Sequence, residues 1–269
     1  MFFIKFLISL IVIYIFICIL AFFLQARLMY FPMKHIFELP SDYGIKYEDI
    51  KIKTKDNILL HSWWIPHEQN RGVVLVCHGN GGNVSHRLHL VNAFQSLGFS
   101  TFLFDYRGYG HSKGKPSEKG TYLDAEAAYN FLINNKQVDP KKIVVYGESL
   151  GSAVAIELAT RKEIGAIILE GSFTSVPDVA AESYFFLPVR WFIRYQYNSL
   201  AKINTLSIPI LFIHSPEDDI ISFKHGKKLF DAYNGEKEFL NTSGGHNDGG
   251  FVNDEKYLSV VQNFLNNNI

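Results

Sequence analysis

The sequence predicts an α/β fold in which a mostly parallel sheet carries helices on both faces. Short unbroken apolar runs recur along the chain, and such runs are typical of strands buried on both sides of a parallel sheet. Segments that favour helix separate most of these runs, as expected for such a sheet. The chain has 269 residues, 48% of them hydrophobic, which is enough to bury one core without disulfides or metals. We therefore expect one α/β domain preceded by an N-terminal segment of different character.

The N-terminal segment is a continuous apolar run over residues 6–24, in which Ser9 is the only clearly polar residue. As a helix this run would extend about 28 Å, which matches the hydrocarbon core of a bilayer. The residues Leu24-Gln25-Ala26 form a poor signal-peptide cleavage site. We therefore expect residues 1–26 to be an uncleaved, single-pass membrane anchor with the lipid bilayer as partner. The flanking basic residues lean only weakly towards a cytoplasmic domain, so its side of the membrane stays open.

The elements of the domain follow from a change of pattern near residue 47. Alternating residues predict a β-hairpin over 47–54 and 57–65. The buried strands that follow are expected at 72–77, 99–104, 143–146, 166–169, 208–213 and 237–240. Helices are expected at 85–97, 122–134, 152–160 and 254–265. The sequence contains no internal repeat, and the pattern predicts one domain over residues 27–269.

One stretch, at about residues 172–206, does not fit the alternation of strands and helices. It contains Tyr184-Phe185-Phe186-Leu187-Pro188 and Trp191-Phe192. A connection of this length in a compact domain usually has a function or a structure of its own. We expect a small helical cap whose aromatic residues line a pocket, dip into a membrane interface or pack the cap itself.

Composition and charge exclude several classes of function. Lys plus Arg and Asp plus Glu balance at 26 each, so no bulk charge favours a nucleic-acid partner. The two cysteines, Cys18 and Cys77, are too few for a disulfide framework or a metal cluster. We interpret both as small buried residues and expect no metal and no cofactor. The sequence does not indicate an oligomeric state.

The chemistry of the chain is centred on Gly147-Glu148-Ser149-Leu150-Gly151, which joins a predicted strand to a predicted helix. A serine in such a tight turn projects its hydroxyl above the sheet, and the flanking glycines permit the sharp turn. Because a serine hydroxyl is a weak nucleophile at neutral pH, it needs an imidazole to accept its proton and an acid to orient that imidazole. We therefore interpret Ser149 as a candidate nucleophile.

The acid and the base are sought at later strand ends, where ligands and reactive groups collect in open α/β sheets. His246, in the loop after the last predicted strand, is the candidate base. Asp218 is the candidate acid, with the adjacent Asp219 as an alternative and Glu170, at the end of an earlier strand, as a second one. Asp248 is interpreted as a loop charge because it is too close to His246 in the chain to support it.

Two backbone amides are needed to stabilise the oxyanion that forms during acyl transfer. Leu150 follows the candidate nucleophile at a helix N-terminus, and Asn80 lies in the glycine-rich loop after another strand. Residues 105–110 are expected to brace the site, with substrate contact by Tyr106 or Arg107 as the alternative. The remaining histidines are expected to be structural or solvated, with two of them, at strand ends, bonded to local backbone: His78, His214, His61, His86, His89, His111 and His225.

Five motifs together resemble the α/β-hydrolase superfamily: H-G-N-G-G-N, F-D-Y-R-G-Y-G-H-S-K-G-K-P-S-E-K-G, G-E-S-L-G, H-S-P-E-D-D-I-I and G-G-H-N-D. More narrowly they resemble its membrane-anchored branch, related to bud-emergence-type hydrolases and eukaryotic depalmitoylases and near the serine aminopeptidase-like domains. The resemblance covers about residues 27–269 and implies nucleophile Ser149, acid Asp218, base His246 and oxyanion donors near Asn80 and Leu150. Ser215 stands where glycine is usual, which affects only the local turn. The cysteine-rich palmitoylation segment of the animal depalmitoylases is absent, so their substrate is not carried over.

These observations predict a membrane-anchored serine hydrolase that cleaves carboxylic esters or thioesters through an acyl-enzyme. A peptidase or amidase of the serine aminopeptidase-like type remains an alternative, because the same residues would permit it. A catalytically silent binding module on a hydrolase scaffold is a third hypothesis. The expected substrate is an acyl ester or thioester, and acyl length and leaving group stay open.

Overall fold

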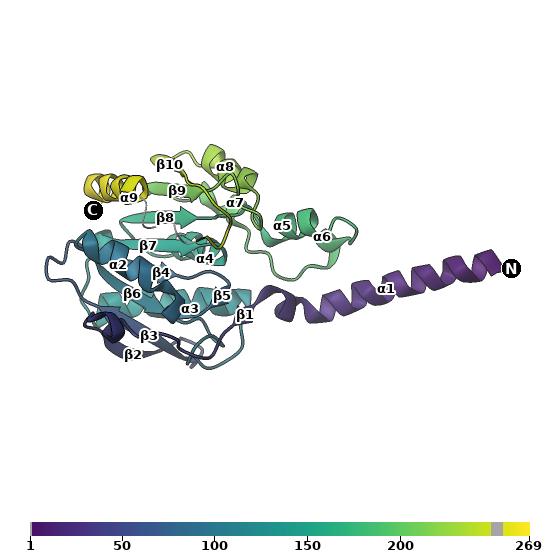
Figure 1. Cartoon of the computed structure of the whole chain (residues 1–269), viewed down its shortest axis with the longest axis horizontal. Helices are drawn as coiled ribbons and strands as arrows, with labels where there is room; N and C mark the ends of the chain where they lie inside the picture. Colours follow the sequence, from purple (N-terminus) through teal and green to yellow (C-terminus); the bar gives the residue numbers. More distant parts are fainter. Residues whose placement is uncertain (1, 249–254) are drawn as a thin grey trace.

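The fold is organised around a single large sheet (Figure 1). The computed structural model describes residues 2–248 and 255–269, and within them eight strands form this sheet in the order β10-β9-β8-β7-β4-β6-β3-β2. The pairing is parallel from β10 to β6, whereas β3 is antiparallel to both β6 and β2. The strands are β2 (Glu48–Lys53), β3 (Leu59–Ile65), β4 (Val73–Cys77), β6 (Ser100–Phe104), β7 (Ile143–Glu148), β8 (Ala166–Glu170), β9 (Ile210–His214) and β10 (Lys237–Asn241).

Helices cover both faces of the sheet, and each face has its own apolar core. Along β4, alternate residues point to opposite sides: Leu75 packs in one core and Val74 in the other. One face carries α3 (Glu118–Asn134), α4 (Leu150–Ala159) and α8 (Phe223–Ala232), and the other carries α2 (Leu88–Ser96) and α9 (Glu255–Asn268). Burial on both faces explains why these strands are uninterrupted apolar runs in the sequence.

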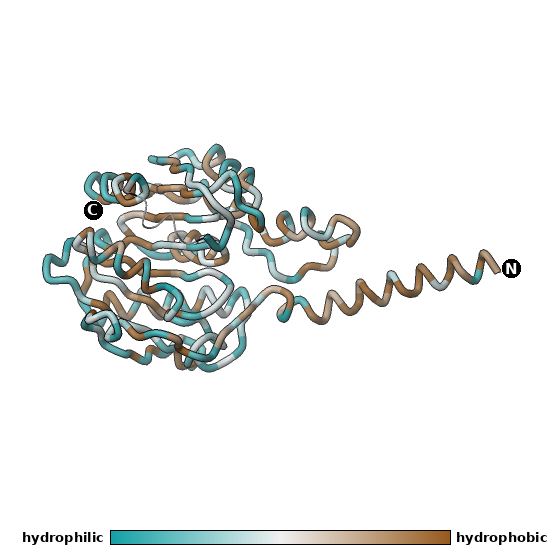
Figure 2. The backbone as a smooth tube through the Cα atoms, viewed as in Figure 1, coloured by the Kyte–Doolittle hydropathy of each residue, from teal (hydrophilic) through white to brown (hydrophobic). Residues whose placement is uncertain are grey.

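The first helix, α1 (Phe2–Met29), projects away from the domain as one long apolar rod (Figures 1 and 2). Within the described part of the chain it is the helix that is long and apolar enough to cross a membrane. It is longer at both ends than the predicted 6–24 and continues three residues beyond residue 26. Pro32 lies just beyond its end, where a proline is incompatible with further helix. Cys18 is half-buried on α1, so its interpretation as a buried residue is wrong, whereas Cys77 is buried as predicted.

A small second sheet joins the segment after α1 to the loop that follows β4. Strand β1 (Phe31–Pro32) pairs in parallel with β5 (Gly81–Gly82), in the glycine-rich loop that follows β4. The Asn83 side chain strengthens this junction, because its amide donates to the carbonyls of Met33 and His35 at 3.1 and 2.6 Å. The sequence patterns do not predict this pairing, since two-residue strands have no periodicity to recognise.

Between β8 and β9 the chain forms three short helices, α5 (Val176–Ser183), α6 (Val189–Phe192) and α7 (Ser199–Ile203). Helices α5 and α6 project from the domain on the same side as α1 (Figure 1). Ser175 caps α5, since its hydroxyl accepts a hydrogen bond from the amide of Asp178 at 3.2 Å. We refer to residues 172–206 as the cap segment.

Most predicted elements are present, with shifted ends. The hairpin forms as β2 and β3, and the α/β fold with its mostly parallel sheet is confirmed. Helix α3 begins at Glu118, four residues before the prediction, because Ser117 caps it there. The predicted helix 85–97 divides into a 3-10 turn (Val84–Arg87) and α2. The sequence patterns do not predict α8, and residue 254 of the last predicted helix lies outside the described residues.

Candidate active site

Ser149 lies in a strained turn between β7 and α4. Its φ and ψ are 51° and −115°, a conformation that non-glycine residues rarely adopt. Glycines flank the turn because space is lacking: a Cβ at Gly151 would collide with the backbone of Cys77, and one at Gly147 would collide with the backbone of Gly151. The turn therefore holds the hydroxyl of Ser149 above the carboxyl edge of the sheet.

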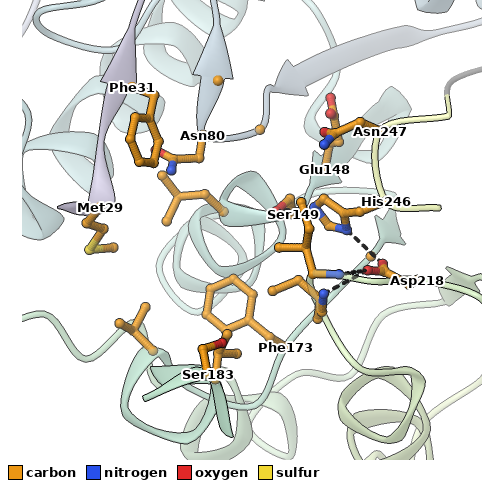
Figure 3. Close-up of a pocket in the computed structure, with 18 of the residues that line it drawn as sticks. Met29, Phe31, Asn80, Glu148, Ser149, Phe173, Ser183, Asp218, His246 and Asn247 are labelled. Carbon is orange, nitrogen blue, oxygen red and sulfur yellow. Dashed lines mark hydrogen bonds and ion pairs between the residues drawn. The ribbon is translucent and has the colours of Figure 1, made fainter. Parts of the chain in front are cut away.

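Three side chains from separate loops meet at this turn in a hydrogen-bonded series (Figure 3). The Ser149 Oγ lies 2.9 Å from His246 Nε2, and His246 Nδ1 lies 2.7 Å from Asp218 Oδ2. Because an ionised carboxylate only accepts hydrogen bonds, Nδ1 carries the proton and Nε2 is free to accept one from the serine. The arrangement is chemically capable of nucleophilic attack by serine with imidazole as the base.

The side chain of Asp218 is only 4% exposed, and its acceptor capacity is filled. Its Oδ1 accepts hydrogen bonds from the amides of Ile220 at 3.0 Å and Ile221 at 2.7 Å. His214 adds a contact from Nε2 to Oδ2 at 3.3 Å. Burial by itself raises the pKa of this carboxyl, but the hydrogen bonds from His214 and His246 outweigh it and hold the pKa well below its usual range. Asp218 is therefore a stable anion facing His246.

The alternative acids occupy other positions. Asp219 Oδ1 accepts a hydrogen bond from the backbone amide of His246 at 3.0 Å, so it fixes the loop and leaves the ring to Asp218. The carboxylate of Glu170 is bonded to the hydroxyls of Tyr146 and Tyr257. Asp248 accepts from the amide of Gly245 at 2.5 Å within its own loop. Of the four carboxylates, the structure pairs Asp218 with the imidazole.

The charge around His246 favours its protonated form. Burial lowers the pKa of the imidazole, but the hydrogen bond and negative charge of Asp218 raise it, with further contributions from Glu148 and Glu170. The net result is a pKa above the ordinary value for histidine. Glu148 is itself held by Arg87, whose Nε lies 2.6 Å from Oε2. Burial raises the pKa of Glu148, but the positive charge of Arg87 outweighs it and keeps that pKa low.

The two proposed oxyanion donors lie beside Ser149. Leu150 is the first residue of α4, so its amide has no acceptor inside the helix. Asn80 lines the same pocket, and Figure 3 shows it on the side of Ser149 away from His246. The hydroxyl of Tyr109 donates to the Asn80 side chain at 3.0 Å, which fixes the loop that carries the Asn80 amide.

A pocket of about 790 Å³ opens over Ser149. It is mainly apolar, and its walls come from distant parts of the chain. Helix α1 contributes Gln25 and Met29, the cap segment contributes Tyr184 and Leu187, and β1 contributes Phe31. This volume and lining are typical of a small-molecule site. Of the roles expected for the cap aromatics, lining a pocket is confirmed for Tyr184.

Several predicted supporting roles are confirmed. His78 Nδ1 lies 2.7 Å from the carbonyl of Gly79, and His214 Nε2 lies 2.9 Å from that of Ile221, so both are bonded to local backbone. Residues 105–110 brace the site as predicted, since Tyr109 donates to Asn80, whereas Arg107 pairs with Asp56 and Asp124 and does not line the pocket.

Other roles are missed by the sequence analysis. His86 and His89, expected to be structural or solvated, line the pocket. The contact of His214 with Asp218 is also missed, and its signal is the four-residue spacing within H-S-P-E-D. The pairing of Arg87 with Glu148 has no such signal, because the two residues are distant in the chain.

Comparison with known proteins identifies the family. Residues 72–198 match the family of the α/β-hydrolase fold. The α/β-hydrolase domain-containing protein WAV2 of Arabidopsis thaliana is 33% identical over 90% of this chain and 87% of its own. An uncharacterised membrane protein of Saccharomyces cerevisiae is 32% identical over 85% of this chain and 82% of its own. Protein bem46 of Schizosaccharomyces pombe is 34% identical over 68% of this chain and 64% of its own.

Among solved structures, an esterase from Pyrococcus furiosus superposes with a TM-score of 0.76 at 25% identity. The match covers 88% of this chain and 99% of the esterase. The fold and its relatives define the protein as a hydrolase built on an α/β scaffold. The chain belongs to the α/β-hydrolase superfamily, in its bud-emergence-type branch.

Proposed function

We propose that the protein is a membrane-anchored serine hydrolase that cleaves carboxylic esters or thioesters through an acyl-enzyme. The observation that carries the proposal is the unbroken series from Ser149 Oγ through His246 to Asp218, with distances of 2.9 and 2.7 Å. The strained turn at Ser149 supports it, since backbone strain of this kind concentrates at functional sites.

Acylation begins when Ser149 Oγ attacks the substrate carbonyl and its proton passes to His246 Nε2. Asp218 stabilises the imidazolium that forms. The carbonyl oxygen, now an oxyanion, accepts hydrogen bonds from the amides of Leu150 and Asn80. The tetrahedral species collapses, the carbon–leaving group bond breaks, and the leaving alkoxide or thiolate takes the proton from Nε2.

Deacylation repeats these steps with water as nucleophile. His246 accepts a proton from the water as it attacks the acyl-enzyme, and the second tetrahedral species again forms between the amides of Leu150 and Asn80. When it collapses, Ser149 recovers its proton from Nε2 and the carboxylic acid leaves. The imidazole must be neutral at the start of both half-reactions, so activity rises with pH through the pKa of His246.

The proposed anchor is α1, which spans the membrane once. The length of its apolar run matches a hydrocarbon core, and the related yeast protein is described as a membrane protein. A mainly apolar pocket that α1 itself helps to line suits a substrate with an apolar acyl group. Each CH₂ of such a group contributes about 0.8 kcal/mol on burial, so affinity is expected to increase with chain length.

The decisive experiment uses the full chain in detergent micelles and a fluorophosphonate probe, which reacts covalently with activated serines. Ser149 should be labelled, and 4-methylumbelliferyl butyrate should be hydrolysed. The Ser149→Ala variant should no longer be labelled, and its kcat should fall about 10⁶-fold, by analogy with other serine hydrolases. Ser259→Ala, at an exposed position of α9 outside the pocket, is the matched control and should retain both labelling and kcat. Equal hydrolysis by Ser149→Ala and the unmodified chain would refute the proposal.

A further inference from the structure

The last turns of α1 form a wall of the active-site pocket. Ala21, Gln25, Leu28 and Met29 line the same cavity as Ser149. Gln25 is only 8% exposed, although the apolar window of the same helix contains no buried residue. The element proposed to cross the membrane is therefore also part of the substrate site.

Hydrogen bonds connect the cap segment to α1 at two positions along the helix. Near the domain, Gln25 Nε2 donates to the carbonyl of Phe192 at 3.1 Å, and its Oε1 accepts from the amide of Arg194 at 2.8 Å. Further along the helix, the hydroxyl of Tyr14 donates to the carbonyl of Phe186 at 2.9 Å. Tyr14 and Gln25 are eleven residues apart, which corresponds to about 16 Å of helix. The cap thus follows α1 for a length comparable to half of a hydrocarbon core.

The outer surface of the cap carries three large exposed aromatic side chains. Phe185, Phe186 and Trp191 are 84%, 57% and 91% exposed, and Figure 2 shows hydrophobic residues along both α1 and the α5–α6 region. Exposing such a patch to water is unfavourable in free energy. Patches of this kind are typical of a membrane contact. Because these residues lie along the proposed spanning helix, the hydrocarbon of the same leaflet is the environment that covers them.

Part of the backbone at the cap tip is hydrogen-bonded within the protein. In hydrocarbon every exposed backbone polar group needs a partner within the protein. The amides of Tyr184, Leu187 and Trp191 donate to carbonyls within the cap segment at 2.8 to 3.0 Å. The hydrogen bond from Tyr14 gives the Phe186 carbonyl a partner on α1.

We propose that a long acyl chain dissolved in the bilayer enters the pocket sideways, between α1 and the cap, and reaches Ser149 without passing through water. The lateral wall of this entrance consists of Ala21, Gln25 and Met29 of α1 with Tyr184 and Leu187 of the cap. The substrate class is an ester or thioester whose acyl chain resides in the leaflet. This inference rests on the proposed function and adds to it the route and the length of the acyl group.

Two esters with the same leaving group test the route. The full chain is placed in phosphatidylcholine vesicles and assayed with 4-methylumbelliferyl palmitate, which dissolves in the bilayer, and with the water-soluble butyrate. Ala21→Trp places a large ring in the lateral wall, whereas Leu20→Trp makes a similar change at a neighbouring exposed residue outside the pocket. The palmitate-to-butyrate ratio of kcat/KM should fall at least tenfold in Ala21→Trp and stay unchanged in Leu20→Trp.

The outcomes separate the two proposals. An unchanged ratio in Ala21→Trp, with the butyrate still hydrolysed, overturns lateral entry and leaves the hydrolase proposal standing. Absence of Ser149-dependent hydrolysis of both esters by the unmodified chain overturns the hydrolase proposal instead. An equal fall of the ratio in both tryptophan variants also overturns lateral entry, because it would mean that α1 acts only as an anchor.

Trp191 provides a second, independent measurement. The other two tryptophans, Trp63 and Trp64, are buried in the domain, so Trp191 is the natural reporter of the cap. In vesicles of phosphatidylcholine brominated on the acyl chain, fluorescence of the full chain should be quenched, and Trp191→Phe should remove that quenching. Fluorescence equal in brominated and unbrominated vesicles would place the cap in water and overturn the proposal.

Two sources can deliver such a chain, a glycerolipid or an acylated cysteine. 1-Palmitoylglycerol and an S-palmitoyl peptide are therefore compared in the same vesicles. Cleavage of the first assigns lateral entry to oxygen esters of lipids, and cleavage of the second assigns it to thioesters. Cleavage of neither, with 4-methylumbelliferyl butyrate still hydrolysed, overturns the proposed substrate class.

Discussion

The candidate active site and the α1–cap region are stabilised in opposite ways. Around Ser149, strand ends and buried side chains fix each group by several hydrogen bonds, as the four partners of Asp218 illustrate. Between α1 and the cap, a few hydrogen bonds from Tyr14 and Gln25 connect elements whose outer surfaces are exposed and apolar. The comparison separates catalytic groups that are held within the domain from a proposed entrance whose apolar outer surface we propose is covered by the membrane.

If the site is held by buried polar contacts, replacing one of them should have the largest effect. Asp218→Asn should reduce kcat about 10⁴-fold, because the amide can no longer hold His246 in its reactive tautomer. Asp219→Asn is the matched control and should lose less than tenfold, since its Oδ1 still accepts the His246 amide. Steady-state assays with a soluble ester in micelles measure both. Equal losses would mean that the adjacent aspartates have been assigned the wrong roles.

The pH dependence of kcat/KM in the unmodified chain and in Asp218→Asn tests the electrostatic role of Asp218. Asp218 raises the pKa of His246, so in the unmodified chain kcat/KM should increase with pH through a midpoint above the ordinary histidine value. In Asp218→Asn the midpoint should move to lower pH, because the stabilising negative charge is gone. A midpoint that moves to higher pH would contradict the electrostatic role of Asp218.

A second prediction concerns stability rather than rate. Burial raises the pKa of Glu170 to about 7, although hydrogen bonds from Tyr146 and Tyr257 oppose that shift. The folded chain therefore binds a proton that the unfolded chain has lost, and stability should fall as pH rises from about 4.5 to 7. Each pKa unit corresponds to about 1.4 kcal/mol. Glu170→Gln should flatten this fall, as thermal unfolding in detergent between pH 4.5 and 8 would reveal.

A conservative change at a surface glutamate is the control that assigns the pH effect to Glu170. Glu163→Gln, at an exposed residue that does not line the pocket, should leave the pH dependence of unfolding as it is in the unmodified chain. A slope in Glu170→Gln equal to that of the unmodified chain would show that the Glu170 carboxyl does not bind a proton preferentially in the folded state.

The smallest effect on stability is expected at the cap tip. Phe185→Ser with Trp191→Ser removes two exposed rings, so unfolding in detergent should change by no more than about 0.5 kcal/mol. Hydrolysis of the palmitoyl ester in vesicles should nevertheless fall several-fold, because the cap loses its contact with the leaflet. A large loss of stability would instead mean that the rings pack the cap, which would remove the contrast between the two regions.

Local patterns in the sequence determine much of this protein. Uninterrupted apolar runs predict the buried strands, because a strand covered on both faces has no polar side. The order of Ser149, Asp218 and His246 at strand ends predicts their meeting, because parallel strands bring their carboxyl ends to one edge. The continuous apolar run before residue 27 predicts a spanning helix from its length and composition.

Tertiary structure alone decides which groups share the pocket and what each carboxylate does. Asp218 and Asp219 are adjacent in the sequence, which favours Asp218 but leaves Asp219 as an alternative, and the path of the loop directs one to the imidazole and the other to a backbone amide. Likewise, α1 is simply apolar in the sequence, and its role as a pocket wall arises from contacts with residues more than 150 positions away. Contacts at such separations leave no local periodicity, so they appear only when the chain has folded.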